Sequence, residues 1–104
     1  MARAPRISVN PAKIAEFCQR WHIVELSLFG SVLRDDFRSD SDVDVLVEFE
    51  PGYTPGWKFF DAREELEAMF GRPVDLVSKP ALRNPFRRHE ILRTRQVVYD
   101  TRAA

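Results

Sequence analysis

The stretch at residues 28–47 reads LFGSVLRDDFRSDSDVDVLV and decides which fold this chain adopts. An apolar segment turns at Gly30 and Ser31, and after a polar connection a second apolar segment begins with Asp42-Val43-Asp44. Alternate side chains of a strand point to the same face, so we expect Asp42 and Asp44 side by side, with roughly 7 Å between their Cα atoms. That spacing suits one or two divalent cations held between oxygens, which would in turn hold the phosphates of a nucleotide.

A third acid, Asp75, lies inside the apolar segment at 73–78. If this segment pairs beside the strand expected at 42–49, Asp75 projects toward the same place as Asp42 and Asp44. Two unit charges at 4 Å repel by about 4 kcal/mol at an effective dielectric constant of 20, which a small domain tolerates poorly. The acids should therefore be protonated, splay into water or hold a divalent cation, and oxygen ligands favour magnesium or manganese.

The glycine-serine corner before these acids is suited to binding an anion. Gly30 permits a positive φ and a close backbone approach, and Ser31 offers a hydroxyl and an N–H at the start of a short helix expected at about 31–37. Arg34 follows about one turn later and can reach the same phosphates. Ser41, directly before the acids, either binds phosphate or caps the loop. Taken alone, such residues are more often a plain turn or a solvated charge.

The bulk composition is that of one small soluble domain. The chain has 104 residues, of which 44% are hydrophobic and 31% charged, and its formal net charge is zero. We expect a single domain at 1–104 with its core at about 10–100. Zero net charge argues against direct nucleic-acid binding, and no apolar run approaches membrane-spanning length. Residues 1–8 lack the apolar run of a secretory signal and Cys18 is the sole cysteine, so a cytoplasmic location is expected.

Periodicity and end signals predict alternating helices and strands. Helices are expected from residue 11, at about 31–37, at 57–70 and from 85 to about 93, with strands at 23–29, 42–49, 73–78 and 96–99. Asn10 and Asn84 each precede a proline and are expected to cap helices, and Gly71 is expected to end one. Short and helical connections together predict an α+β fold, with a mixed sheet and helices packed mainly on one face. The strand order does not follow from the pattern.

Two surface features stay open between a structural and a functional interpretation. Aromatic residues in and after the Pro-Gly loop are interpreted mainly as core, with a partner interface as the alternative: Tyr53, Trp57, Phe59 and Phe60. Basic residues near the C-terminus are interpreted mainly as a solvated face, with an acidic partner or phosphate as the alternative: Lys79, Arg83, Arg87, Arg88, Arg93 and Arg95. The loop acids Asp35, Asp36 and Asp40 are interpreted as solvent-facing charges.

The combination of Gly30, Ser31, Asp42, Asp44 and Asp75 resembles the pattern of the minimal nucleotidyltransferases of the DNA-polymerase-β-like superfamily. The resemblance covers most of the chain, from the first expected helix to the last strand. Many of these proteins are the antitoxin half of HEPN/MNT toxin–antitoxin pairs. One departure is an aspartate directly after Arg34, where the family often has glycine.

The resemblance implies transfer of AMP from ATP to a tyrosine of a HEPN-type RNase toxin, which the transfer neutralises. Asp42, Asp44 and Asp75 would hold two magnesium ions, with manganese possible, and Gly30 and Ser31 would bind the triphosphate. Asp75 would also help to deprotonate the attacking hydroxyl. The implied partners are ATP and the toxin, in a possible hetero-oligomer.

Three other functions compete with this one. A binding-only antitoxin would keep the fold and neutralise its toxin by forming a complex. A nucleic-acid binder would use the basic residues, against the zero net charge. A nucleotidyltransferase acting on a small molecule such as an aminoglycoside would need an acceptor site, which larger relatives build from an extra helical domain.

Overall fold

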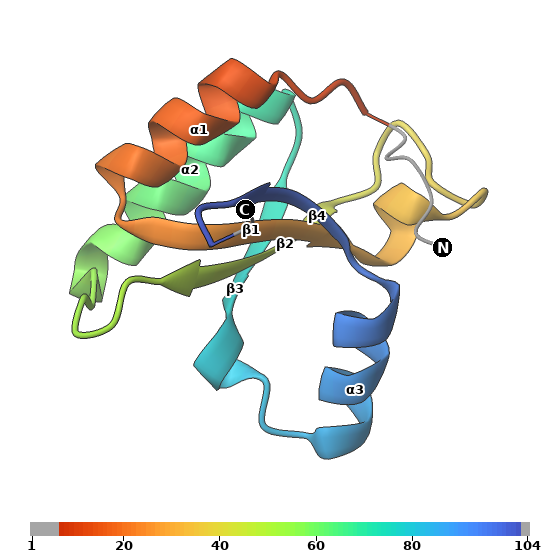
Figure 1. The fold of residues 1–104 in the computed structure, drawn as a ribbon. Helices are drawn as coiled ribbons and strands as arrows, with labels where there is room; N and C mark the ends of the chain where they lie inside the picture. The colour runs from red at the N-terminus through yellow and green to blue at the C-terminus, as the bar shows by residue number, and fades with distance from the viewer. Residues whose placement is uncertain (1–6, 103–104) are drawn as a thin grey trace.

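The computed structural model describes residues 7–102, and its elements follow the predicted order (Figure 1). They are α1 (Pro11–Arg20), β1 (Ile23–Phe29), β2 (Val43–Phe49), α2 (Phe59–Phe70), β3 (Val74–Ser78), α3 (Pro85–Thr94) and β4 (Gln96–Asp100), with 3₁₀ turns η1 (Gly30–Leu33), η2 (Gly56–Lys58) and η3 (Lys79–Ala81). The prediction for residues 1–8 lies mostly outside the described residues. Within the described part, no helix combines the length and apolarity needed to cross a membrane.

The four strands form one mixed sheet in the order β3-β2-β1-β4. β1 pairs antiparallel with β2 and β4, and β2 pairs parallel with β3. The expected mixed sheet is therefore confirmed. The strand at 42–49 pairs with the one that contains Asp75, which is the condition under which the three acids were expected to meet. Along β2, Val43, Val45 and Val47 are fully buried on one face, while Asp44 and Leu46 lie on the other.

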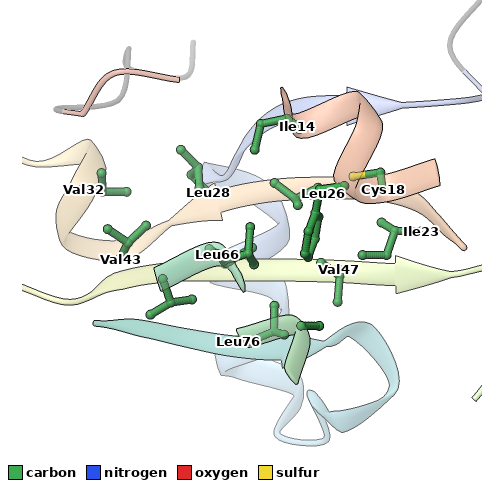
Figure 2. Packing of buried hydrophobic residues seen from close by; sticks show 14 of the residues in the cluster. Ile14, Cys18, Ile23, Leu26, Leu28, Val32, Val43, Val47, Leu66 and Leu76 are labelled. Atoms are coloured by element: carbon green, nitrogen blue, oxygen red, sulfur yellow. The ribbon is translucent and has the colours of Figure 1, made fainter. Parts of the chain in front are cut away.

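The main core lies between the sheet and α1 and α2, which run side by side on one face (Figure 1). Asn10 caps α1 as predicted, because its Oδ1 accepts from the N–H groups of Ala12 and Lys13. Figure 2 shows Ile14 and Cys18 from α1 and Leu66 from α2 meeting the sheet side chains. Gly71 ends α2 with a φ of 71°, as predicted.

Figure 1 shows α3 on the opposite side of the sheet from α1 and α2, and a smaller core lies between α3 and that face. Asn84 caps α3 through its Oδ1, which accepts from the N–H groups of Phe86 and Arg87. Ile91 of α3 packs with Phe29 of β1, Leu46 of β2 and the connecting Leu82. Two helices thus cover one face and α3 covers the other.

The helix expected at 31–37 is wrong in length, because the structure has only the single 3₁₀ turn Gly30–Leu33. Arg34 adopts an extended backbone, with φ −116° and ψ 162°, and this ends the helix. Phe37 then packs against the main core, where the guanidinium of Arg72 lies 4.5 Å from the centre of its ring. Phe37 thus anchors the middle of the polar connection between η1 and β2 to the main core.

Candidate active site

The carboxylates converge where β2 and β3 begin. Asp44 is the direct register partner of Asp75 in the parallel pair, so the two side chains leave the same face of the sheet. Asp42 lies just before β2 and, like Asp75, is exposed, whereas Asp44 is half-buried. The structure therefore brings the predicted acids from two neighbouring strands to one end of the sheet.

Gly30 lies directly against the Asp44 carboxylate. Its φ is +74°, a left-handed conformation that favours glycine, and a Cβ built on it would clash with Oδ2 of Asp44. The pairing of Phe29 with Asp44 across β1 and β2 explains this approach, because Gly30 is the next residue along the chain. Position 30 therefore requires glycine, because any side chain there would collide with the carboxylate of Asp44.

The electrostatics of the site centre on Asp44. Burial raises its pKa to about 6, and the carboxylates of Asp75 and then Asp42 add to the rise. The guanidinium groups of Arg34 and Arg87 oppose it. A group of oxygen donors that repel one another suits a hard divalent cation, although no three His, Cys, Asp or Glu side chains within residues 7–102 form a ready-made metal cluster.

The remaining predicted phosphate ligands lie in the η1 turn and the connection to β2. Ser31 is half-buried, and its carbonyl accepts from the N–H of Arg34. Arg34 is exposed, and its Nε donates to Asp36 over 3.2 Å. Ser41 caps the loop, because its Oγ accepts from the N–H of Arg38 over 2.9 Å. Its second role as a phosphate ligand stays a prediction.

Sequence reasoning missed Arg72, which holds this connection in place. Its Nη1 donates to the carbonyls of Arg38 and Ser41 over 2.9 and 3.3 Å. The Ser41 carbonyl directly precedes Asp42, so Arg72 fixes the chain where the acids begin. No local signal identifies this role, because the partners are 31 and 34 residues away.

A cleft of about 720 Å³ opens beside Gly30, between the η1 turn and the second half of α3. Asp35 and Asp36 line it together with Arg34, so these two acids are exposed but not remote from the site. Ile91 lines the opposite wall from α3. The carboxylates of Asp42, Asp44 and Asp75 lie outside its lining, but Gly30, which lines the cleft, lies against the Asp44 carboxylate.

The basic residues near the C-terminus divide into two groups. Lys79 and Arg95 are mostly buried and bind the carboxylate of Glu25, so their interpretation as a solvated face is wrong. Arg87 is exposed and contributes positive charge at Asp44. Arg87 precedes Ile91 by four positions and so shares the helix stripe that faces the sheet. That spacing is a signal from which Arg87 could have been identified.

The aromatic residues after the Pro-Gly loop divide in the same way. Phe59 is half-buried and packs against the main core, and Tyr53 is half-buried beside Phe49. Trp57 and Phe60 are 88% and 50% exposed, so two of the four aromatic residues lie outside the core.

The chain is similar to known proteins along most of its length. The model of the nucleotidyltransferase domain family matches residues 12–98. The protein adenylyltransferase MntA of Thermococcus cleftensis is 38% identical over 94 residues, which span 88% of this chain and 89% of that protein. A solved protein described as a minimal nucleotidyltransferase superposes with a TM-score of 0.68 at 36% identity, over 82% of this chain and 85% of the other.

A chain from a toxin–antitoxin crystal structure with AMP-PNP has the same fold, with a TM-score of 0.71 at 18% identity over 90% of this chain and 76% of that one. The prediction of a polymerase-β-like α+β fold is confirmed by these likenesses. The prediction of an enzyme of the nucleotidyl-transferring class is confirmed by the family match. The chain belongs to the nucleotidyltransferase domain family, and among its members it is similar to the minimal nucleotidyltransferases.

Proposed function

We propose that this protein transfers AMP from ATP to a hydroxyl of a partner toxin and thereby acts as an antitoxin. The observation that carries the proposal is the placement of Asp44 opposite Asp75, with the backbone of Gly30 against the Asp44 carboxylate. The side chains of Asp44 and Asp75 leave the same face at one end of the sheet, where bound divalent cations would connect them to a triphosphate beside Gly30.

The metal ligands in this proposal are Asp42, Asp44 and Asp75. All three offer carboxylate oxygens, the donors that magnesium prefers, and their mutual repulsion at Asp44 is relieved by a bound cation. Two bound magnesium ions, or manganese in their place, would neutralise charge on the triphosphate and on the departing pyrophosphate.

The other residues act on the nucleotide and the acceptor. Gly30 and Ser31 bind the triphosphate, with Arg34 and Ser41 as further phosphate ligands. The acceptor oxygen bonds to the α-phosphorus, the bond from that phosphorus to the bridging oxygen breaks, and pyrophosphate leaves. Asp75 takes the proton of the acceptor hydroxyl.

The proposed partner is a HEPN-type RNase toxin, modified on a tyrosine in the cytoplasm. Support comes from the relative named as a protein adenylyltransferase and from the fold shared with a toxin–antitoxin structure. The exposed Trp57 and Phe60, which stack with ring centres 6.4 Å apart, give such a partner an aromatic surface to contact in a hetero-oligomer.

The test is to mix the protein with ATP, magnesium and the product of its neighbouring gene, and to weigh that product by mass spectrometry. A gain of one or more AMP units is expected for the wild type and for Asp40→Asn, an exposed loop acid outside the proposed site. The double variant Asp42→Asn with Asp44→Asn should give none. An unchanged gain in the double variant would refute the proposal.

A binding-only antitoxin is the second candidate, favoured by the lack of a ready-made metal cluster within residues 7–102. It predicts that the double variant still neutralises the toxin by forming a complex. Toxin activity measured with and without ATP separates the two functions.

A further inference from the structure

Glu25 is a buried carboxylate on the α3 face of the sheet, away from the proposed metal ligands. It is 6% exposed and pairs with Glu48 across β1 and β2. Among the described residues, three cations bind it: Arg95 at 2.6 Å, Arg102 at 3.1 Å and Lys79 at 3.4 Å. A buried carboxylate held this way is sensitive to the loss of a single partner.

Two of these cations stand at the two ends of one segment, residues 79–95. Lys79 is its first residue, directly after β3, and also binds Glu48 at 3.0 Å. Arg95 is its last residue and forms the C-cap of α3. Within the segment, Arg88 Nη1 donates to the carbonyl of Lys79 over 3.0 Å, and this hydrogen bond connects α3 to the first residue of the segment. Both ends of the segment therefore converge on Glu25.

Apolar packing alone holds this segment weakly. Leu82 and Ile91 are its buried side chains, with Leu92 partly buried beside them. The first turn of α3 instead exposes Phe86, which is 85% open to solvent. The ion pairs of Lys79 and Arg95 with Glu25 therefore add to a small apolar contact between the segment and the sheet.

The segment carries one wall of the site. Ile91 and Thr94 of α3 line the cleft beside Gly30, and Arg87 of the same helix contributes positive charge at Asp44. We propose that Glu25 is a positioning residue, which through Lys79 and Arg95 holds α3 against the sheet and so keeps the cleft wall in place for the nucleotide. The effect on nucleotide binding rests on the proposed function. The docking of α3 against the sheet does not, since it is a property of the chain itself.

Arg102 provides a matched control. It binds the same carboxylate at 3.1 Å but lies after β4, outside residues 79–95. Arg95→Gln and Arg102→Gln each remove one guanidinium from Glu25. Only the first should loosen α3.

The test is hydrogen exchange of the intact protein, followed by mass spectrometry. Arg95→Gln should speed the exchange of α3 amides by about tenfold relative to the wild type, with little change in β1 and β2. Arg102→Gln should leave α3 at the wild-type rate, apart from any change shared by the whole chain. Equal α3 exchange in the two variants would overturn the proposal.

The kinetics of AMP transfer supply an independent readout. When only a fraction of the protein has α3 docked, the apparent affinity for ATP falls by that fraction, while saturating ATP restores the docked state. Arg95→Gln should therefore raise the KM for ATP with kcat almost unchanged. A fall in kcat at unchanged KM would instead report a loss of folded protein and would count against positioning.

Two further arms keep the outcomes distinct. If Arg95→Gln fails to fold, Arg95→Lys replaces it, because lysine keeps the positive charge but has fewer hydrogen-bond donors. Arg95→Lys should also speed the exchange of α3 amides, by a smaller factor than Arg95→Gln. A wild type without AMP transfer would refute the proposed function, whereas the exchange experiment would still decide the role of Glu25.

Discussion

The carboxylate of Asp44 occupies the space that a Cβ atom on Gly30 would need. Gly30→Ala must therefore displace the acid as well as adopt a left-handed backbone, which costs about 1–2 kcal/mol for an L-residue. We expect this variant to remain folded but to lose magnesium-dependent binding of an ATP analogue, because the Asp44 side chain has to turn away.

Gly52→Ala is the control for that variant. Gly52 has a φ of +85°, and no atom of residues 7–102 outside its chain neighbours lies within 4 Å of its Cβ position, so alanine there meets only the conformational cost. Urea unfolding should show a loss of stability in Gly52→Ala and a larger loss in Gly30→Ala, which also has to move the Asp44 carboxylate. Calorimetric titration should show nucleotide binding lost in Gly30→Ala alone. Equal binding by the two would show that the contact with Asp44 is unimportant.

Replacing Asp44 should stabilise the protein in metal-free buffer. Its pKa is raised to about 6, first by burial and then by Asp75 and Asp42, above the ordinary value of 3.8. Between these pH values the folded state binds more protons than the unfolded state, so stability falls as pH rises through this window and then levels off. Asp44→Asn removes the penalty and should gain about 1 kcal/mol at pH 7 once solvent screening is allowed for.

The measurement is urea unfolding of wild type, Asp44→Asn and Asp40→Asn at about pH 4 and pH 7. The gain should appear at the higher pH and shrink at the lower one, and Asp40→Asn should follow the wild type. A loss of stability at pH 7 in Asp44→Asn would mean that the ionised carboxylate has a favourable partner in the folded protein.

Ser27 offers a stabilising substitution away from the site. It is fully buried at the centre of β1, and its Oγ has no hydrogen-bond partner within the described residues. Removing an unpaired buried hydroxyl relieves its desolvation cost, so Ser27→Ala should raise the free energy of unfolding by about 1 kcal/mol. Thermal unfolding beside Ser39→Ala, an exposed control, measures this. A lower melting temperature for Ser27→Ala would reveal a partner such as a bound water.

Cys18 should react only when the protein opens. It is fully buried on α1, and burial raises the pKa of its thiol to about 12. The thiolate is the reactive form, so an aromatic disulfide reagent should label native protein slowly and denatured protein at once. Immediate labelling of the native chain would contradict the packing of α1.

Local signals in the sequence predicted most elements because each has a local physical cause. The Asn-Pro pairs at the starts of α1 and α3 and the glycine after α2 act within a few residues, and the structure shows them in those roles. The alternation along β2 likewise predicted which face is buried. The in-strand position of Asp75 predicted that it would lie near Asp44 if the two strands paired, and the structure shows that they do.

The rest could not be predicted because it depends on contacts distant in sequence. The strand order and the crossing of α3 to the opposite face are properties of the assembled sheet. Arg95 and Lys79 bind Glu25, which lies 70 and 54 residues away from them in sequence. The clustering of basic residues near the C-terminus does not reveal these partners, and it therefore predicted a solvated face. The helix after Gly30 was predicted too long because nothing in its composition shows that Arg34 turns extended.

Calorimetric titration of a non-hydrolysable ATP analogue, with and without magnesium, tests the central claim most directly. The wild type should bind the analogue tightly only when magnesium is present, and Asp44→Asn and Asp75→Asn should each lose that dependence while Asp40→Asn keeps it. Binding by the wild type that is equally strong without magnesium, or unchanged magnesium-dependent binding in Asp44→Asn, would contradict a nucleotide site built on these acids.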